Sequence, residues 1–144
     1  MPTILDGKIA RDSYKKTLIE KVSLLACIPK LALIQVGTNA ESSIYIEQKK
    51  KFALSIGTAI EHIQFAETDD ENRIMEKIAF LNNEKSVHGI IVQLPLPHTF
   101  DALRLINAIS PLKDVDGLTD ENQRLLAEKH PRFVPATAKG VSLL

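Results

Sequence analysis

Residues 31–65, LALIQVGTNAESSIYIEQKKKFALSIGTAIEHIQF, hold the clearest structural pattern in this chain of 144 residues. The short apolar run Leu31–Val36 is followed by a glycine and is typical of a buried strand. Glu41–Ile56 has the spacing of a helix, and Gly57 is suited to end it. Thr58–Phe65 alternates enough to form a second strand. A strand, a helix and a strand in this order predict a parallel βαβ unit.

The alternation of helices and strands continues on both sides of this unit. Gly89–Leu94 is a third apolar strand, which two nearby prolines end. We expect helices at Ile9–Ala26, from Thr68 to about Leu81, at Ala102–Ile109, from a Thr119 cap to about Lys129, and from Lys139 to Leu144. This order predicts one α/β domain over residues 1–144, with three layers (α/β/α) and a mostly parallel sheet.

Composition argues against several classes of protein. The chain is 44% hydrophobic, and its 18 basic residues balance 18 acidic ones, so charge gives no reason to expect nucleic acid or a membrane as partner. No apolar run approaches the roughly 20 residues that span a bilayer. The single cysteine, Cys27, cannot form an internal disulfide, and its apolar neighbours predict a thiol packed in the core. These features, and a start without a long apolar stretch, favour a cytoplasmic protein.

The helix Glu41–Ile56 places a lysine among residues expected to face the core. At about 100° per residue one stripe of this helix holds Ser42, Tyr45, Lys49, Phe52 and Ile56. A partly desolvated lysine can serve as a catalytic acid or base. The alternative is a lysine that buries its stem and extends its amine to water, which is common. The flat ring of Tyr45 could stack on a ligand or only pack.

A polar residue interrupts the third strand near its carboxyl end. Gln93 follows Gly89–Val92 and precedes Leu94–Pro97, at the kind of position where open α/β sheets bind ligands. The alternative is an amide that satisfies the backbone of the loop. The pattern leaves both readings open.

Two carboxylates lie in the turn Lys113–Gly117, KDVDG. The Asp-x-Asp-Gly pattern matches part of a calcium loop, but Glu121 comes too early to be the bidentate ligand of such a loop. Asp114 and Asp116 can serve ordinary turn chemistry, in which aspartate bonds its own backbone. The functional alternative is an acceptor for a heterocycle rich in N–H groups.

No motif for a metal or a nucleotide occurs in the chain. The four histidines lack paired ligand spacing, so we predict no metal site. The six glycines form neither G-x-G-x-x-G nor a P-loop, so we predict no cofactor-binding residue here. Any nicotinamide cofactor would bind outside this chain.

Four segments, taken together, resemble a known enzyme family. In order they are Ile4–Lys8 (ILDGK), Gln35–Gly37 followed by Ser42–Tyr45 and Lys49, Gly89–Pro97 (GIIVQLPLP), and Lys113–Gly117 (KDVDG). This combination resembles the bifunctional methylenetetrahydrofolate dehydrogenase and methenyltetrahydrofolate cyclohydrolase. The likeness covers nearly the whole chain.

The resemblance implies a set of roles. The family oxidises 5,10-methylenetetrahydrofolate with NADP or NAD and hydrolyses the methenyl product to 10-formyltetrahydrofolate, in one-carbon metabolism and purine biosynthesis. Lys49 would be the catalytic acid/base, and Gln93 would bond to it and tune it. Tyr45 would stack on the folate, Asp116 would hold the pterin, and Ser42 would join them in binding substrate. The resemblance also implies a dinucleotide-binding (Rossmann) domain after this segment, which is absent from this chain, and a possible homodimer.

The sequence departs from the family at a few positions. Ala136 and Ala138 stand where the family has cysteine and proline, and Arg124 stands where it has glycine, so a bulky charge could disturb packing there. We therefore expect a truncated folate-handling catalytic domain. The first alternative is a folate-binding or interaction module without turnover. The second is a plain α/β nucleotide-binding domain, which the missing glycine-rich loop disfavours.

Overall fold

The computed structural model describes residues 7–142, in which helices and strands alternate as the sequence predicts. The elements are, in chain order, α1 (Gly7–Ser23), β1 (Lys30–Val36), α2 (Ala40–Ser55), β2 (Ala59–Phe65), α3 (Glu71–Asn83), β3 (Gly89–Val92), α4 (Ala102–Asn107), α5 (Asp120–Ala127) and α6 (Ala136–Ser142). Most of the segment Ile4–Lys8, and the predicted helical residues Leu143 and Leu144, lie outside the described residues.

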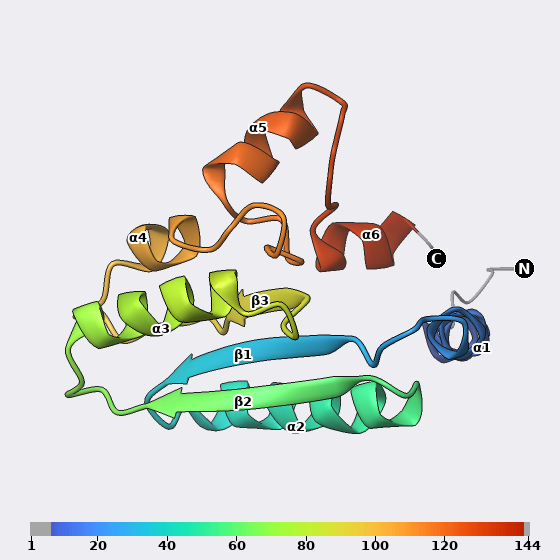
Figure 1. Ribbon diagram of the computed structural model, residues 1–144, viewed down its shortest axis with the longest axis horizontal. Helices are drawn as coiled ribbons and strands as arrows, with labels where there is room; N and C mark the ends of the chain where they lie inside the picture. Colours follow the sequence, from blue (N-terminus) through green and yellow to red (C-terminus); the bar gives the residue numbers. More distant parts are fainter. Residues whose placement is uncertain (1–6, 143–144) are drawn as a thin grey trace, which may run out of the picture.

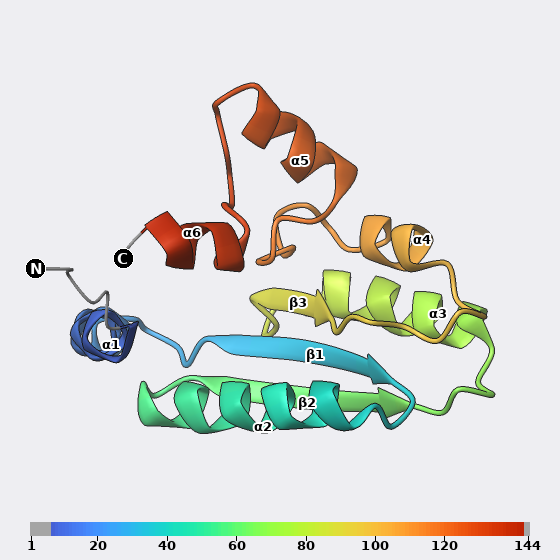
Figure 2. The ribbon, with the colours of Figure 1, turned by 180° about the vertical axis from the view of Figure 1, so that it is seen from behind.

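The sheet has three parallel strands in the order β2-β1-β3. Strand β1 is central: Lys30 pairs with Ala59 of β2, and Leu31 pairs with Gly89 of β3. Helix α2 covers one face of the sheet and α3 covers the other, as the two opposite views show (Figures 1 and 2). The predicted three-layer arrangement with a parallel sheet is confirmed.

The core follows the alternation of side chains along the strands. Residues of β1 and β3 on one face meet α3 and α4 in a single apolar cluster, made by Ala32, Ile34, Val36, Ile74, Ile78, Leu81, Val87, Ile90, Val92, Leu105 and Ile109. Leu33 and Ile91 alternate to the other face, where α2 provides the buried Ile46. The strands therefore bury apolar side chains on both faces of the sheet, one face against α3 and the other against α2.

Most predicted boundaries hold within two or three residues. Gly57 has φ 81° directly after the end of α2, and the Thr119 side chain accepts from the backbone N–H of Asn122 at the start of α5. The predicted start of the third helix at Thr68 is wrong. Asp70 is the cap of α3, since its carboxylate accepts from Asn72 N–H, while the Asp69 carboxylate closes the preceding turn.

The prediction that Cys27 packs in the core is also wrong. The side chain is exposed, in the loop that joins α1 to the amino end of β1. Its apolar neighbours Leu24, Leu25 and Ile28 are exposed with it. An apolar run of this length predicts burial only if an element covers it, and no described element covers this loop.

Candidate functional site

Helix α2 presents Lys49 at the edge of its buried face. Asn39 begins the helix, because its side-chain oxygen accepts from the backbone N–H of Ser42 at 2.9 Å. The buried residues of the helix are Ser42, Ile46 and Ala53. The predicted core-facing stripe is therefore rotated: Lys49 is half-buried, and Tyr45 is 60% exposed. The helix turns its small and branched residues to the sheet, which leaves the larger ring of Tyr45 outside.

Lys49 and Gln93 form a direct hydrogen bond. The amine Nζ of Lys49 donates to Oε1 of Gln93 at 3.0 Å, although 44 residues separate them in sequence. Gln93 is held by its own backbone, whose N–H donates to the carbonyl of Ile34, and its Nε2 donates to the carbonyl of Leu94 at 2.7 Å. Both readings of Gln93 therefore apply: its Nε2 bonds to the backbone of the loop, and its Oε1 accepts the hydrogen bond from Lys49.

Asp116 lies within electrostatic reach of Lys49. Burial raises the pKa of the Asp116 carboxyl above its ordinary value, while the charge of Lys49 lowers it and the charge of Asp114 raises it further. The residue comes from the turn that continues alongside β3, where Ile90 bridges to Asp114. The fold therefore brings three predicted site residues, Lys49, Gln93 and Asp116, to the carboxyl end of β3.

The Asp114 carboxylate, unlike that of Asp116, is held by hydrogen bonds from other described residues. It is 1% exposed, and its carboxylate accepts from the backbone N–H groups of Leu118 and Thr119 and from the side-chain amide of Asn122. Burial alone would raise the pKa of Asp114, but these hydrogen bonds outweigh it and the pKa is lowered. Of the two carboxylates in KDVDG, that of Asp114 holds the turn, whereas no hydrogen bond to that of Asp116 occurs among the described residues.

The two remaining predicted residues lie on the same helix. The hydroxyl of Ser42 is buried and has no hydrogen-bond partner within the described part of the chain. Such an orphaned group is uncommon and is often satisfied by a ligand or a water. Tyr45 lies one turn before Lys49 with its ring exposed. Both are therefore free of the interactions that would mark them as purely structural.

Sequence reasoning missed two supporting residues. Lys113 donates from Nζ to the carbonyls of Leu81 and Glu84, both at 2.8 Å, and so ends α3 and anchors the turn. Asn122 is fully buried and bonds to Asp114. A lysine or asparagine beside a turn is too common a pattern to identify such roles from sequence.

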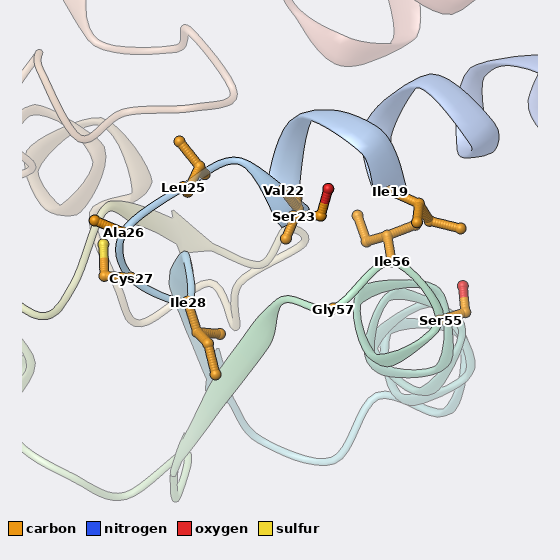
Figure 3. A pocket seen from close by; sticks show the side chains of 10 residues that line it. All are labelled: Ile19, Val22, Ser23, Leu25, Ala26, Cys27, Ile28, Ser55, Ile56 and Gly57. Carbon is orange, nitrogen blue, oxygen red and sulfur yellow. The ribbon is translucent and has the colours of Figure 1, made fainter.

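Hollows occur at both ends of the sheet. At the carboxyl ends of β1 and β3 a hollow of about 690 Å³ is lined by Val36, Asn39, Glu67, Thr68 and Pro95–Thr99, next to the loop that follows Gln93. A second hollow, of about 400 Å³, lies between α1, the loop before β1 and the end of α2 (Figure 3). Its lining is mainly apolar, and none of the predicted site residues lines either of these two hollows.

The helix starts beside the sheet do not suit a dinucleotide phosphate. At α2 the Ser42 N–H is already bonded to the Asn39 side chain, and at α3 the carboxylate of Asp70 caps the helix beside Asp69. Acidic caps repel phosphate, which binds at free N–H groups of a helix start.

Arg124 is exposed on α5 and pairs with Glu128, so it does not disturb packing.

The described residues hold neither a cluster of metal ligands nor a membrane-spanning helix. In residues 7–142 no three or more His, Cys, Asp or Glu side chains gather as a metal site would require. No described helix is both long enough and apolar enough to cross a membrane.

Comparison with known proteins identifies relatives along the whole chain. Bifunctional protein FolD of Dechloromonas aromatica is 40% identical over 141 residues, which cover 96% of this chain and 50% of that protein. The crystal structure of the bifunctional enzyme FolD, methylenetetrahydrofolate dehydrogenase/cyclohydrolase, from Campylobacter jejuni superposes with a TM-score of 0.95 at 35% identity, over 99% of this chain and 52% of that one.

A third relative carries ligands. The Trypanosoma brucei N5,N10-methylenetetrahydrofolate dehydrogenase-cyclohydrolase, solved with NADP cofactor and inhibitor, superposes with a TM-score of 0.92 at 31% identity, over 99% of this chain and 51% of that one. The chain thus spans about half the length of the relatives that it matches.

The family model for the catalytic domain of tetrahydrofolate dehydrogenase/cyclohydrolase matches residues 5–116. The match includes α2 with Lys49, strand β3 with Gln93 directly after it, and the turn that carries Asp116. Because the match covers most of the chain and the fold agrees throughout, the protein belongs to the tetrahydrofolate dehydrogenase/cyclohydrolase family.

Proposed function

We propose that this chain is the folate-handling catalytic domain of an enzyme that oxidises 5,10-methylenetetrahydrofolate and hydrolyses the methenyl product to 10-formyltetrahydrofolate. The observation that carries the proposal is the Lys49–Gln93 hydrogen bond, with Asp116 in electrostatic reach of the same amine. The family membership supports it, as do the activities named for the relatives.

Lys49 is the catalytic acid/base of the hydrolysis in this proposal. A water adds to the methenyl carbon between N5 and N10 and gives one proton to the amine of Lys49. The bond from that carbon to N5 then breaks, Lys49 passes its proton to N5, and the hydroxyl on the carbon loses its proton as it becomes the formyl C=O on N10, so that one proton is released overall. Gln93 accepts a hydrogen bond from the amine through Oε1 and so orients it. Because the amide is neutral, it adds no negative charge beside the amine, whereas a carboxylate would.

Three further residues bind the substrate. Asp116 accepts two N–H donors from the edge of the pterin, which is the hydrogen-bonding pattern that a carboxylate suits. The exposed ring of Tyr45 stacks against the flat part of the folate. The unpartnered hydroxyl of Ser42 completes the site as a donor or acceptor for the ligand or for a water beside it.

When bound, NADP or NAD would supply the hydride acceptor for the oxidation of the methylene carbon. The starts of α2 and α3 already carry side-chain caps, and we infer that the cofactor binds to a part of the enzyme outside this chain. The Trypanosoma brucei relative, solved with NADP, is about twice as long as this chain, which supports this division. We further propose a cytoplasmic enzyme, able to form a homodimer when complete, that supplies one-carbon units for purine biosynthesis.

The test is calorimetric titration of the 144-residue chain with 5-formyltetrahydrofolate, a reduced folate that is stable in air. We expect binding with an enthalpy that Asp116→Asn reduces. Hydrolysis of methenyltetrahydrofolate, corrected for the spontaneous rate, then separates an active domain from a folate-binding module without turnover. A parallel titration with NADP should show no binding. Micromolar affinity for NADP and none for the folate would contradict the proposal and favour a nucleotide-binding domain.

A further inference from the structure

The turn that carries Asp116 is held by buried hydrogen bonds of its neighbours. Gly117 has φ 67°, a conformation that favours glycine, and its N–H donates to the carbonyl of Asp114 at 3.1 Å. The carboxylate of Asp114 in turn accepts the N–H groups of Leu118 and Thr119. The position of Asp116, between Asp114 and Gly117, therefore depends on how the Asp114 carboxylate is held.

Asn122 holds that carboxylate from α5. Its side chain is 0% exposed, and Nδ2 donates to Asp114 Oδ2 at 2.8 Å and to the carbonyl of Pro111 at 2.9 Å. Its Oδ1 accepts from a guanidinium N–H of Arg132 at 2.9 Å. These bonds use both donors and the acceptor of the amide, so its orientation is determined on all sides.

The same network closes the turn from outside. Arg132 also pairs with Glu121 at 3.2 Å, which ties the segment after α5 to the start of that helix. The next residue, Phe133, brings its carbonyl against Gly117, where a side chain at Gly117 would come within 3.2 Å of it. Asn122 thus lies between the turn and the segment that covers it.

We propose that Asn122 is a positioning residue for substrate recognition, which holds the Asp116 carboxylate opposite Lys49 by way of Asp114 and the Gly117 turn. Asn122 does not line the site and makes no contact with Lys49 or Gln93 among the hydrogen bonds of the described residues. Its influence on folate therefore passes through the turn. This inference rests on the proposed function, since it assumes that Asp116 binds the pterin.

A double-mutant cycle with Asp116 tests the proposal. Asn122→Ala should weaken binding of 5-formyltetrahydrofolate about tenfold, the value of about one hydrogen bond to a charged group. In an Asp116→Asn background the same change should weaken binding less than twofold, because the group that it positions is already altered. Amide hydrogen exchange should become faster at Leu118 and Thr119 in Asn122→Ala, and should stay unchanged in Asp116→Asn.

A gentler pair of variants covers the case in which Asn122→Ala does not fold. Arg132→Met removes the outer partner of Asn122 and should weaken folate binding by two- to fivefold. Arg124→Met is the matched control. The Arg124 guanidinium also pairs with a glutamate, Glu128, but it makes no hydrogen bond to Asn122. This variant should leave the affinity unchanged.

The outcomes separate this inference from the proposed function. If the loss of folate affinity in the double variant equals the product of the losses in Asn122→Ala and Asp116→Asn, the positioning role is overturned. Equal losses of folate affinity in Arg132→Met and Arg124→Met would also overturn it. An affinity unchanged in Asn122→Ala would overturn it as well. No binding of the folate by the unaltered chain would instead overturn the proposed function, and this role with it.

Discussion

The middle and the end of helix α2 have surroundings of opposite character. In the middle, Lys49 donates to Gln93 at 3.0 Å, and its charge lowers the pKa of Asp116. At its end, Ser55 and Ile56 border an apolar hollow with Ile19 and Val22 of α1 (Figure 3). The first region brings polar groups from three distant segments into specific contact. The second exposes apolar area without such contacts, which can support packing but no acid/base chemistry. The difference favours the middle of α2, and not its end, as the place of the proposed chemistry.

The largest effect should come from the catalytic amine. Lys49→Met keeps the apolar stem and removes the proton carrier, so hydrolysis of methenyltetrahydrofolate should fall by about 10²–10⁴-fold, the usual contribution of acid/base catalysis. Affinity for the folate should stay within about tenfold. The measurement is hydrolysis above the spontaneous rate, in a full-length protein that carries this domain.

Lys50→Met is the control for that change. Lys50 is the next residue on α2 and pairs with Glu47 at 2.7 Å instead of entering the site. Its removal should leave turnover nearly unchanged. Equal turnover in the Lys49 and Lys50 variants would mean that Lys49 only extends its amine to water.

The second effect should appear in stability. In Asp114→Asn an amide takes the place of a carboxylate, which only accepts hydrogen bonds. The NH₂ group of the amide must then face one of the N–H donors around it, so the free energy of unfolding should fall by about 2–4 kcal/mol. The pKa of Asp114 is lowered in the folded state, so its contribution is present above the ordinary value of 3.8 and is lost as pH falls below it. Urea unfolding at pH 7 and at lower pH measures both. A stability difference that grows on acidification would contradict the assignment.

The third effect should separate binding from stability. Asp116→Asn should weaken folate binding about tenfold, because a charged acceptor is lost. Burial raises the pKa of Asp116, so its carboxyl favours the fold at low pH and loses that contribution as pH rises through its folded pKa. The neutral variant should therefore be as stable as the parent at pH 7, or more so. A variant that unfolds while the folded fraction keeps its affinity would make Asp116 a turn residue.

The smallest effect should come from the apolar hollow at the end of α2, which Cys27 of the loop before β1 also lines. Cys27→Ser changes an exposed side chain that lines the apolar hollow, so stability should change by no more than about 0.5 kcal/mol. Folate affinity and hydrolysis should be the same as in the parent chain. Thermal unfolding and calorimetry check this, and a clear loss of folate affinity would mean that the two regions are coupled.

The sequence indicated that Lys49, Gln93 and Asp116 belong together better than it indicated which face of α2 is buried. Lys49, Gln93 and Asp116 could be named because each breaks an apolar or turn pattern and belongs to a recognisable motif. The stripe assigned to α2 was wrong in its rotation, since Tyr45 is exposed and Ile46 is buried. Helical spacing tells which residues share a face, but several faces of α2 carry apolar residues, and only packing against the sheet selects one of them.

What the sequence determined by itself is the order of helices and strands, the parallel sheet and the caps at Gly57 and Thr119. These follow from local sterics, periodicity and short-range hydrogen bonds, which a single segment contains. The tertiary structure alone decided that Cys27 is exposed, that Ile46 and not Tyr45 of α2 is buried, and that the pKa values of the two aspartates of one turn shift in opposite directions. Burial, contacts between distant segments and the pKa of a carboxyl depend on what the rest of the chain places around a residue, and no local pattern holds that information.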